Sequence, residues 1–127
     1  MQIAEFQCWV KSIDQDTQWD LVTSLHLVSH LTEEVGELAQ VINRIYDDRG
    51  EKEKHLANLR SELVDVYWLL NKIANKYAIE LDVEVQGFVQ RAKSGLPEKY
   101  RHELLARLQA LDQELAVAKS ALGRNLR

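Results

Sequence analysis

Hydrophobic residues recur at intervals of three and four along most of the chain, the spacing that places them on one face of an α-helix. The pattern predicts five helices. The first covers residues 3–13, the second starts after Asp20 or Thr23 and ends before residue 47, and the third covers residues 56–77. The fourth starts near residue 82 and ends before residue 94, and the last covers residues 98–122. The sequence has one proline and five glycines, and this scarcity of helix breakers favours long helices. We therefore expect an all-α protein, a four- to five-helix bundle in which residues 14–19 form a polar connection.

Local signals mark several helix ends. Asp20 or Thr23 is expected to cap the second helix, because a short polar side chain can accept a hydrogen bond from a free backbone N–H there. Residues 47–50 are expected to stop that helix, and Pro97 suits the first turn of the last one. Gly123 is expected to end the last helix.

The last predicted helix carries a heptad seam. Five leucines and one alanine, at positions 104, 108, 111, 115, 118 and 122, are separated alternately by four and three residues. Such a seam packs along another helix, either in the same bundle or in another subunit. The apolar surface of this seam and of the stripe over residues 56–77 is together larger than one small helix bundle can bury. We therefore expect a homodimer or a dimer of dimers, with a pocket lined by more than one chain.

Two acidic clusters lie beside the apolar stripes of the second and third helices. The first cluster is Glu33, Glu34 and Glu37, and the second is Glu62 and Asp65. Residues three or four apart are neighbours on a helix, so these like charges repel one another. No lysine or arginine stands at helical spacing beside them. Divalent cations that prefer oxygen ligands, such as Mg²⁺, would relieve the repulsion.

Composition and charge fit one soluble domain of 127 residues, of which 28% are charged and 46% hydrophobic. The net charge of −4 argues against general nucleic-acid binding. Residues 91–127 nevertheless hold 8 basic and 4 acidic residues, so this tail could contact a subunit or an anionic substrate, or lie solvated. The lone Cys8 excludes an internal disulfide framework, and we see no signal peptide or membrane span. These features favour a cytoplasmic protein.

The acidic clusters and their surroundings resemble a known family. Leu-Thr-Glu-Glu-Val-Gly-Glu-Leu-Ala at 31–39 and Glu-Leu-Val-Asp-Val-Tyr-Trp-Leu-Leu at 62–70 are similar to the motifs of the MazG-like nucleoside triphosphate pyrophosphohydrolases. That superfamily includes dimeric dUTPases and dCTP pyrophosphatases. The resemblance covers roughly residues 20–100. It implies a MazG-like domain over 1–100. Residues 101–127 lack the proline that relatives usually have after the basic tail, and from the heptad seam we expect them to form a helical extension that serves as an oligomer contact.

The resemblance implies hydrolysis between the α and β phosphates of a nucleoside triphosphate, giving a monophosphate and pyrophosphate, as nucleotide-pool house-cleaning. In relatives the acids of both motifs hold Mg²⁺, for which Mn²⁺ can substitute. Carried over by position, the ligands are Glu34, Glu37, Glu62 and Asp65. Glu33 is an additional acid that would hold a further ion or take the proton of the attacking water. Bound Mg²⁺ would neutralise phosphate charge and align the water.

Candidates for contact with the substrate lie near the acids or in the basic segment after them. They are His30, Trp68, Asn71, Lys72, Lys93 and Tyr100. Trp68 follows Asp65 by one turn and could stack on a base, and Lys72 follows it by two turns and could meet phosphates. Lys93 and Tyr100 belong to a segment that resembles the basic tail of relatives. The structural alternatives are core packing for the tryptophan and solvated surface positions for the lysines.

Two other classes compete with this hypothesis. A di-iron carboxylate bundle requires Glu-x-x-His pairs, and no histidine here has a glutamate three residues before it. A non-catalytic helical interaction or scaffold protein would use the 104–122 seam but would leave the acids unexplained. Stabilisation by Mg²⁺ or Mn²⁺ distinguishes the classes, because only a protein that binds the metal in its native state is stabilised by it.

Overall fold

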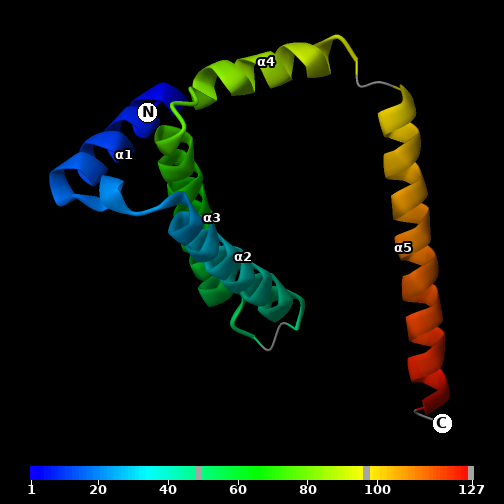
Figure 1. Cartoon of the computed structure of the whole chain (residues 1–127). Helices are drawn as coiled ribbons and strands as arrows, with labels where there is room; N and C mark the ends of the chain where they lie inside the picture. The colour runs from blue at the N-terminus through cyan, green and yellow to red at the C-terminus, as the bar shows by residue number, and fades with distance from the viewer. Residues whose placement is uncertain (48–49, 96–97, 126–127) are drawn as a thin grey trace. The chain divides into compact units, whose positions relative to one another are not determined.

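The computed structural model describes residues 1–47, 50–95 and 98–125, and these residues form helices joined by short connections (Figure 1). The helices are α1 (Ile3–Thr17), the short 3₁₀ helix η1 (Trp19–Leu21), α2 (Ser24–Tyr46), α3 (Lys52–Lys76), α4 (Leu81–Lys93) and α5 (Glu98–Asn125). No described residue lies in a strand. The prediction of an all-α protein with five main helices is confirmed.

The chain divides into two compact units, Met1–Val85 and Gln86–Arg127. In the first unit, α2 and α3 run antiparallel and side by side, and α1 packs against α3 (Figure 1). The buried apolar residues all come from these three helices. They are Val10, Leu27, Val41, Leu69 and Ala74. Of these five, only Val10 lies on a predicted apolar stripe. The other four lie beside the stripes of α2 and α3, and stripe residues such as Leu25, Val28 and Leu63 are exposed, so the core is displaced from the predicted faces.

Helix α2 begins where the sequence indicates. The Thr23 side chain accepts a hydrogen bond of 3.2 Å from the backbone N–H of His26, so Thr23 is the N-cap. Residues 48 and 49, in the segment expected to stop this helix, lie outside the described residues, as does Pro97.

Helix α1 is longer than predicted, because it continues through Asp14 to Thr17 rather than ending at Ile13. Gln18 ends it in the left-handed conformation, with φ of 61°. Asp14 is buried and lies one turn after the buried Val10. The expectation of a polar connection over residues 14–19 is wrong, because Asp14 finds a charged partner inside the protein.

Gln7 of α1 connects this helix to the segment between α3 and α4. Its side-chain amide donates to Oδ1 of Asn75 at 3.0 Å and to the carbonyl of Ile79 at 2.7 Å. Its side-chain oxygen accepts from the backbone N–H of Leu81 at 3.0 Å. One side chain therefore fixes both the end of α3 and the start of α4.

The second unit differs from expectation in two ways. In α4, whose residues 86–93 belong to this unit, the spacing of Val85, Phe88 and Val89 predicts a face directed inward, but all three side chains are exposed. Helix α5 continues through Gly123 to Asn125, so the prediction that this glycine ends the helix is wrong. A glycine within a helix costs only about 1 kcal/mol relative to alanine, which the rest of a long helix can absorb.

No helix within the described residues combines the length and the apolar character needed to cross a lipid bilayer.

Candidate metal centre

Three of the predicted acids converge between α2 and α3. One carboxylate oxygen from each of Glu34, Glu62 and Asp65 lies within 4.8 Å of the others. Glu62 and Asp65 share a face of α3 because they are three residues apart, and the antiparallel packing of α2 brings Glu34 to the same place. Glu34 and Glu62 are half-buried, whereas Asp65 is exposed.

The other two acids of the first motif lie farther out on α2. Glu37 is exposed, but its charge acts on the Glu62 carboxyl, so it belongs to the same electrostatic cluster. Glu33 is exposed and is not among the three converging acids. The structure thus brings together Glu34, Glu62 and Asp65, with Glu37 at their edge.

The environment of Glu62 is unfavourable for a carboxylate. Partial burial raises the pKa of the Glu62 carboxyl above its ordinary value of 4.5. The negative charges of Glu37 and Glu34, a hydrogen bond with Glu34, and the charge of Asp65 raise this pKa further. Its Oε2 is buried and has no hydrogen-bond partner among the described residues. This oxygen is therefore available as a ligand.

The donor set fits a hard divalent cation. Mg²⁺ is bound by oxygen ligands at about 2.0–2.1 Å, so two oxygens on opposite sides of the ion lie about 4 Å apart. The carboxylate separations of at most 4.8 Å require only small side-chain rotations to reach that distance. Glu34, Glu62 and Asp65 would hold the ion, which would supply the missing partner of the Glu62 oxygen.

The raised pKa of Glu62 predicts how stability depends on pH. The native metal-free protein binds the Glu62 proton more tightly than the unfolded chain, so its free energy of unfolding should fall as pH rises above 4.5 through the native pKa. A cation competes with that proton, so stabilisation by Mg²⁺ should grow over the same range. Melting temperatures measured across this pH range, with and without Mg²⁺, check both trends. Stabilisation by Mg²⁺ that stays constant with pH would contradict the prediction.

His30 lies beside this cluster, as its spacing from Glu34 predicts. Its Nε2 is 3.1 Å from Oε1 of Glu34, and the histidine side chain is the more exposed of the pair. This contact orients the Glu34 carboxylate from its solvent side.

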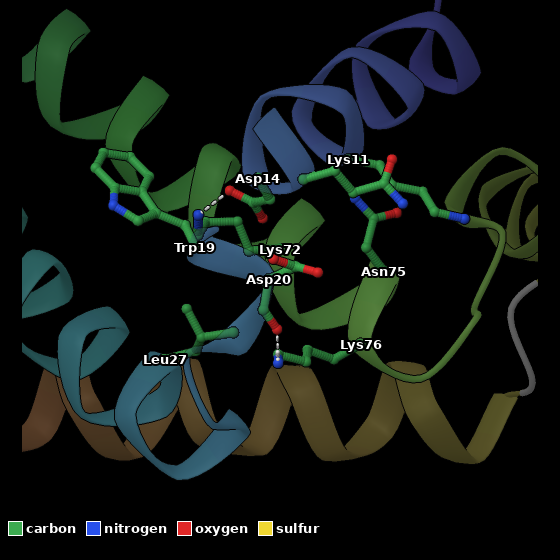
Figure 2. Close-up of a pocket in the computed structure, with 9 residues that line it drawn as sticks. Lys11, Asp14, Trp19, Asp20, Leu27, Lys72, Asn75 and Lys76 are labelled. Carbon is green, nitrogen blue, oxygen red and sulfur yellow. Dashed lines mark hydrogen bonds and ion pairs between the residues drawn. The ribbon is translucent and has the colours of Figure 1, made fainter. Parts of the chain in front are cut away.

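Lys72 was expected either to lie on the solvated surface or to contact a phosphate, and the structure places it in neither environment. It is buried and forms an ion pair and hydrogen bond with Asp14 of α1 (Figure 2). Its Nζ also lies 4.9 Å from the ring centre of Trp19 and 5.5 Å from that of Trp68. Both distances are within the range of a cation–π interaction. In this arrangement the Lys72 charge is neutralised inside the protein.

A cavity of about 240 Å³ lies next to this ion pair (Figure 2). Its lining residues are Lys11, Asp14, Gln15, Trp19, Asp20, Leu27, Lys72, Asn75 and Lys76. The Lys76 ammonium donates to the backbone carbonyl of Asp20, which joins α3 to η1. Three lysines line this cavity. Lys72 and Lys76 have oxygen partners, and the third, Lys11 of α1, is exposed.

Trp68 and Asn71 are packed rather than free. Trp68 is half-buried and meets Trp9 edge-on, with ring centres 5.4 Å apart. Asn71 is fully buried and donates to the backbone carbonyl of Tyr67 at 2.8 Å, while its Oδ1 has no partner among the described residues. These contacts agree with the core-packing alternative for the tryptophan.

The two remaining substrate candidates belong to the second unit. Lys93 is in the last turn of α4 and Tyr100 is in α5, and both are exposed. Their role as substrate contacts stays a prediction.

Asp14, the buried partner of Lys72, is not singled out by the polar character of its sequence neighbours. Its position four residues after Val10 was the available signal, since that spacing places it on the buried face of a helix.

Comparison with known proteins adds one finding. A family model described as the MazG nucleotide pyrophosphohydrolase domain matches residues 22–102, a range that includes both acidic clusters and the whole of α2, α3 and α4. No curated protein and no solved structure matches the chain.

Proposed function

Because the chain belongs to the MazG nucleotide pyrophosphohydrolase family, we propose that it hydrolyses a nucleoside triphosphate between the α and β phosphates. The reaction depends on Mg²⁺, with Mn²⁺ as a substitute, and yields a nucleoside monophosphate and pyrophosphate. The observation that supports this most directly is the convergence of Glu34, Glu62 and Asp65 around a buried carboxylate oxygen that has no protein partner.

Each acid has a distinct part in this proposal. Glu34, Glu62 and Asp65 hold the metal, and Glu37 adds a ligand or a charge at its edge. An ion held there would neutralise triphosphate charge and help to align the attacking water with phosphorus. Glu33, which is exposed and adjacent to Glu34, accepts the proton of that water. His30 holds the Glu34 carboxylate in place.

The substrate contacts are proposed in two groups. Tyr100 and Lys93 remain exposed, and an exposed lysine can meet a phosphate directly. Lys72 acts differently, because Asp14 neutralises its charge: it positions Trp19 and Trp68, whose rings flank its ammonium. We propose that the hydrolysis serves nucleotide-pool house-cleaning in the cytoplasm.

The experiment is a panel of ribo- and deoxynucleoside triphosphates incubated with the purified protein and Mg²⁺. We expect a monophosphate and pyrophosphate in equal amounts, measured by separating the nucleotides and by assaying pyrophosphate and orthophosphate separately. A chelator should abolish turnover, and Mn²⁺ should restore it. Orthophosphate as the first product would overturn the assigned bond, and no turnover of any nucleotide would favour the scaffold alternative.

A further inference from the structure

Helix α5 has an apolar face that no other described residue of the second unit packs against. The leucines of the heptad seam, Leu104, Leu108, Leu111, Leu115 and Leu122, have exposed fractions between 50% and 62%. All side chains of α5 that the structure describes are exposed. A 28-residue helix with a continuous leucine seam gains stability when a second helix covers that seam.

The spacing fixes the heptad positions. Leu108, Leu115 and Leu122 occupy the a positions, and Leu104, Leu111 and Ala118 occupy the d positions. The charged residues that flank the seam then fall at g and e positions. They are Arg107 and Glu114 at g, and Asp112 and Lys119 at e. Side chains at these positions decide which partner, and which direction, a coiled coil accepts.

In a parallel pair in register, each g residue faces the e residue five positions later on the other helix. Arg107 would face Asp112 of the second copy, and Glu114 would face Lys119 of the second copy. Both combinations are attractive, and two-fold symmetry makes each occur twice. Residues five apart do not meet on one helix, so a single copy cannot form these pairs itself.

An antiparallel pair reverses this outcome. With the whole 104–122 seam overlapped, g faces g and e faces e. Glu114 would then face Glu114 of the second copy, and Asp112 would face Asp112. Both combinations repel. The charges therefore select one orientation.

We propose that α5 forms a parallel, in-register, two-stranded coiled coil with α5 of a second copy of this chain. This inference does not depend on the proposed function. The seam covers fewer than three heptads, and coiled coils are usually sustained over about 3–4, so the test uses the full-length chain.

Cysteine cross-linking tests the orientation. In a chain carrying Cys8→Ser, so that only the introduced thiol can react, Leu111→Cys should yield a disulfide-linked dimer after brief mild oxidation. Equivalent core positions of a parallel pair lie within the Cα separation of about 4.4–6.8 Å that a disulfide requires. The matched control is Gln113→Cys, on the outer face of the same helix, which should stay unlinked.

The opposite orientation has its own cross-link. In an antiparallel pair Leu111 faces Leu115 of the second copy, so a mixture of Leu111→Cys and Leu115→Cys chains would link while Leu111→Cys alone would not. That result overturns the proposal. A Leu111→Cys chain that stays unlinked in a dimeric protein, or a monomer by light scattering at micromolar concentration, overturns it as well.

Charge reversal provides the second measurement. Glu114→Lys places like charges opposite Lys119 at two symmetric positions, so dissociation on dilution should occur at about tenfold higher protein concentration. The double variant Glu114→Lys/Lys119→Glu restores opposite charges and should restore association. Equal association of the single and double variants with the unchanged chain overturns the proposed pairing.

Discussion

Replacement of Glu62 by glutamine should lower kcat/KM more than about 100-fold, while the metal-free protein becomes more stable. Loss of groups that merely support metal ligands costs about 10–100-fold, and Glu62 is proposed as a ligand itself. The gain in stability has a separate cause. Glutamine is neutral, so it removes repulsion from Glu34, Glu37 and Asp65 at a half-buried position.

The measurements are steady-state kinetics and thermal unfolding with and without Mg²⁺. Stabilisation by Mg²⁺ should be largely lost in the variant, and the helical signal in circular dichroism should be unchanged. Glu53→Gln is the matched control, because Glu53 is an exposed acid in the first turn of the same helix. An active Glu62→Gln enzyme, or one that keeps the full stabilisation by Mg²⁺, would remove this residue from the metal centre.

Replacement of Asp14 by alanine should lower the free energy of unfolding by about 3–5 kcal/mol, the usual cost of leaving one charge of a buried ion pair without its partner. Lys72 is only 6% exposed, so its ammonium would be left largely buried without a compensating charge. The double variant Asp14→Leu/Lys72→Met should recover most of the loss, since two apolar side chains of similar size need no partner.

Urea denaturation of both single variants and the double variant gives the coupling free energy between the two positions. Asp16→Ala is the control, because Asp16 lies two residues along the same helix and is exposed. Activity should fall in the double variant even where stability recovers, if the lysine positions Trp19 and Trp68 as proposed. A loss below about 1 kcal/mol for Asp14→Ala would show that the pair is solvated in solution.

The sequence predicted the acidic cluster because its geometry is mostly local. Glu62 and Asp65 share a face by their spacing alone, and only the pairing of α2 with α3 was needed to add Glu34. The stripes predicted the two helices, and the observed packing of α2 on α3 supplies that pairing. The helices themselves were predictable for the same reason, since each stripe repeats over several turns.

The environment of Lys72 was not predictable in the same way. Its partner is 58 residues away, in a stretch whose acidic neighbours look like solvated surface. The spacing from Val10 indicates that Asp14 lies on the buried face of α1, but no local pattern identifies Lys72 as its partner. The contact depends on how α1 crosses α3, which is decided by aromatic packing such as the stacking of Phe6 on Tyr67.

The side-chain contacts of α1 with α3 have a consequence for the order of folding. Asp14 and Gln7 bind residues that are 58 and 68 positions later in the chain. During synthesis α1 therefore leaves the ribosome well before its partners exist, with Phe6 and Trp9 uncovered. We infer that the hairpin of α2 and α3 forms first, because its contacts are closer in sequence.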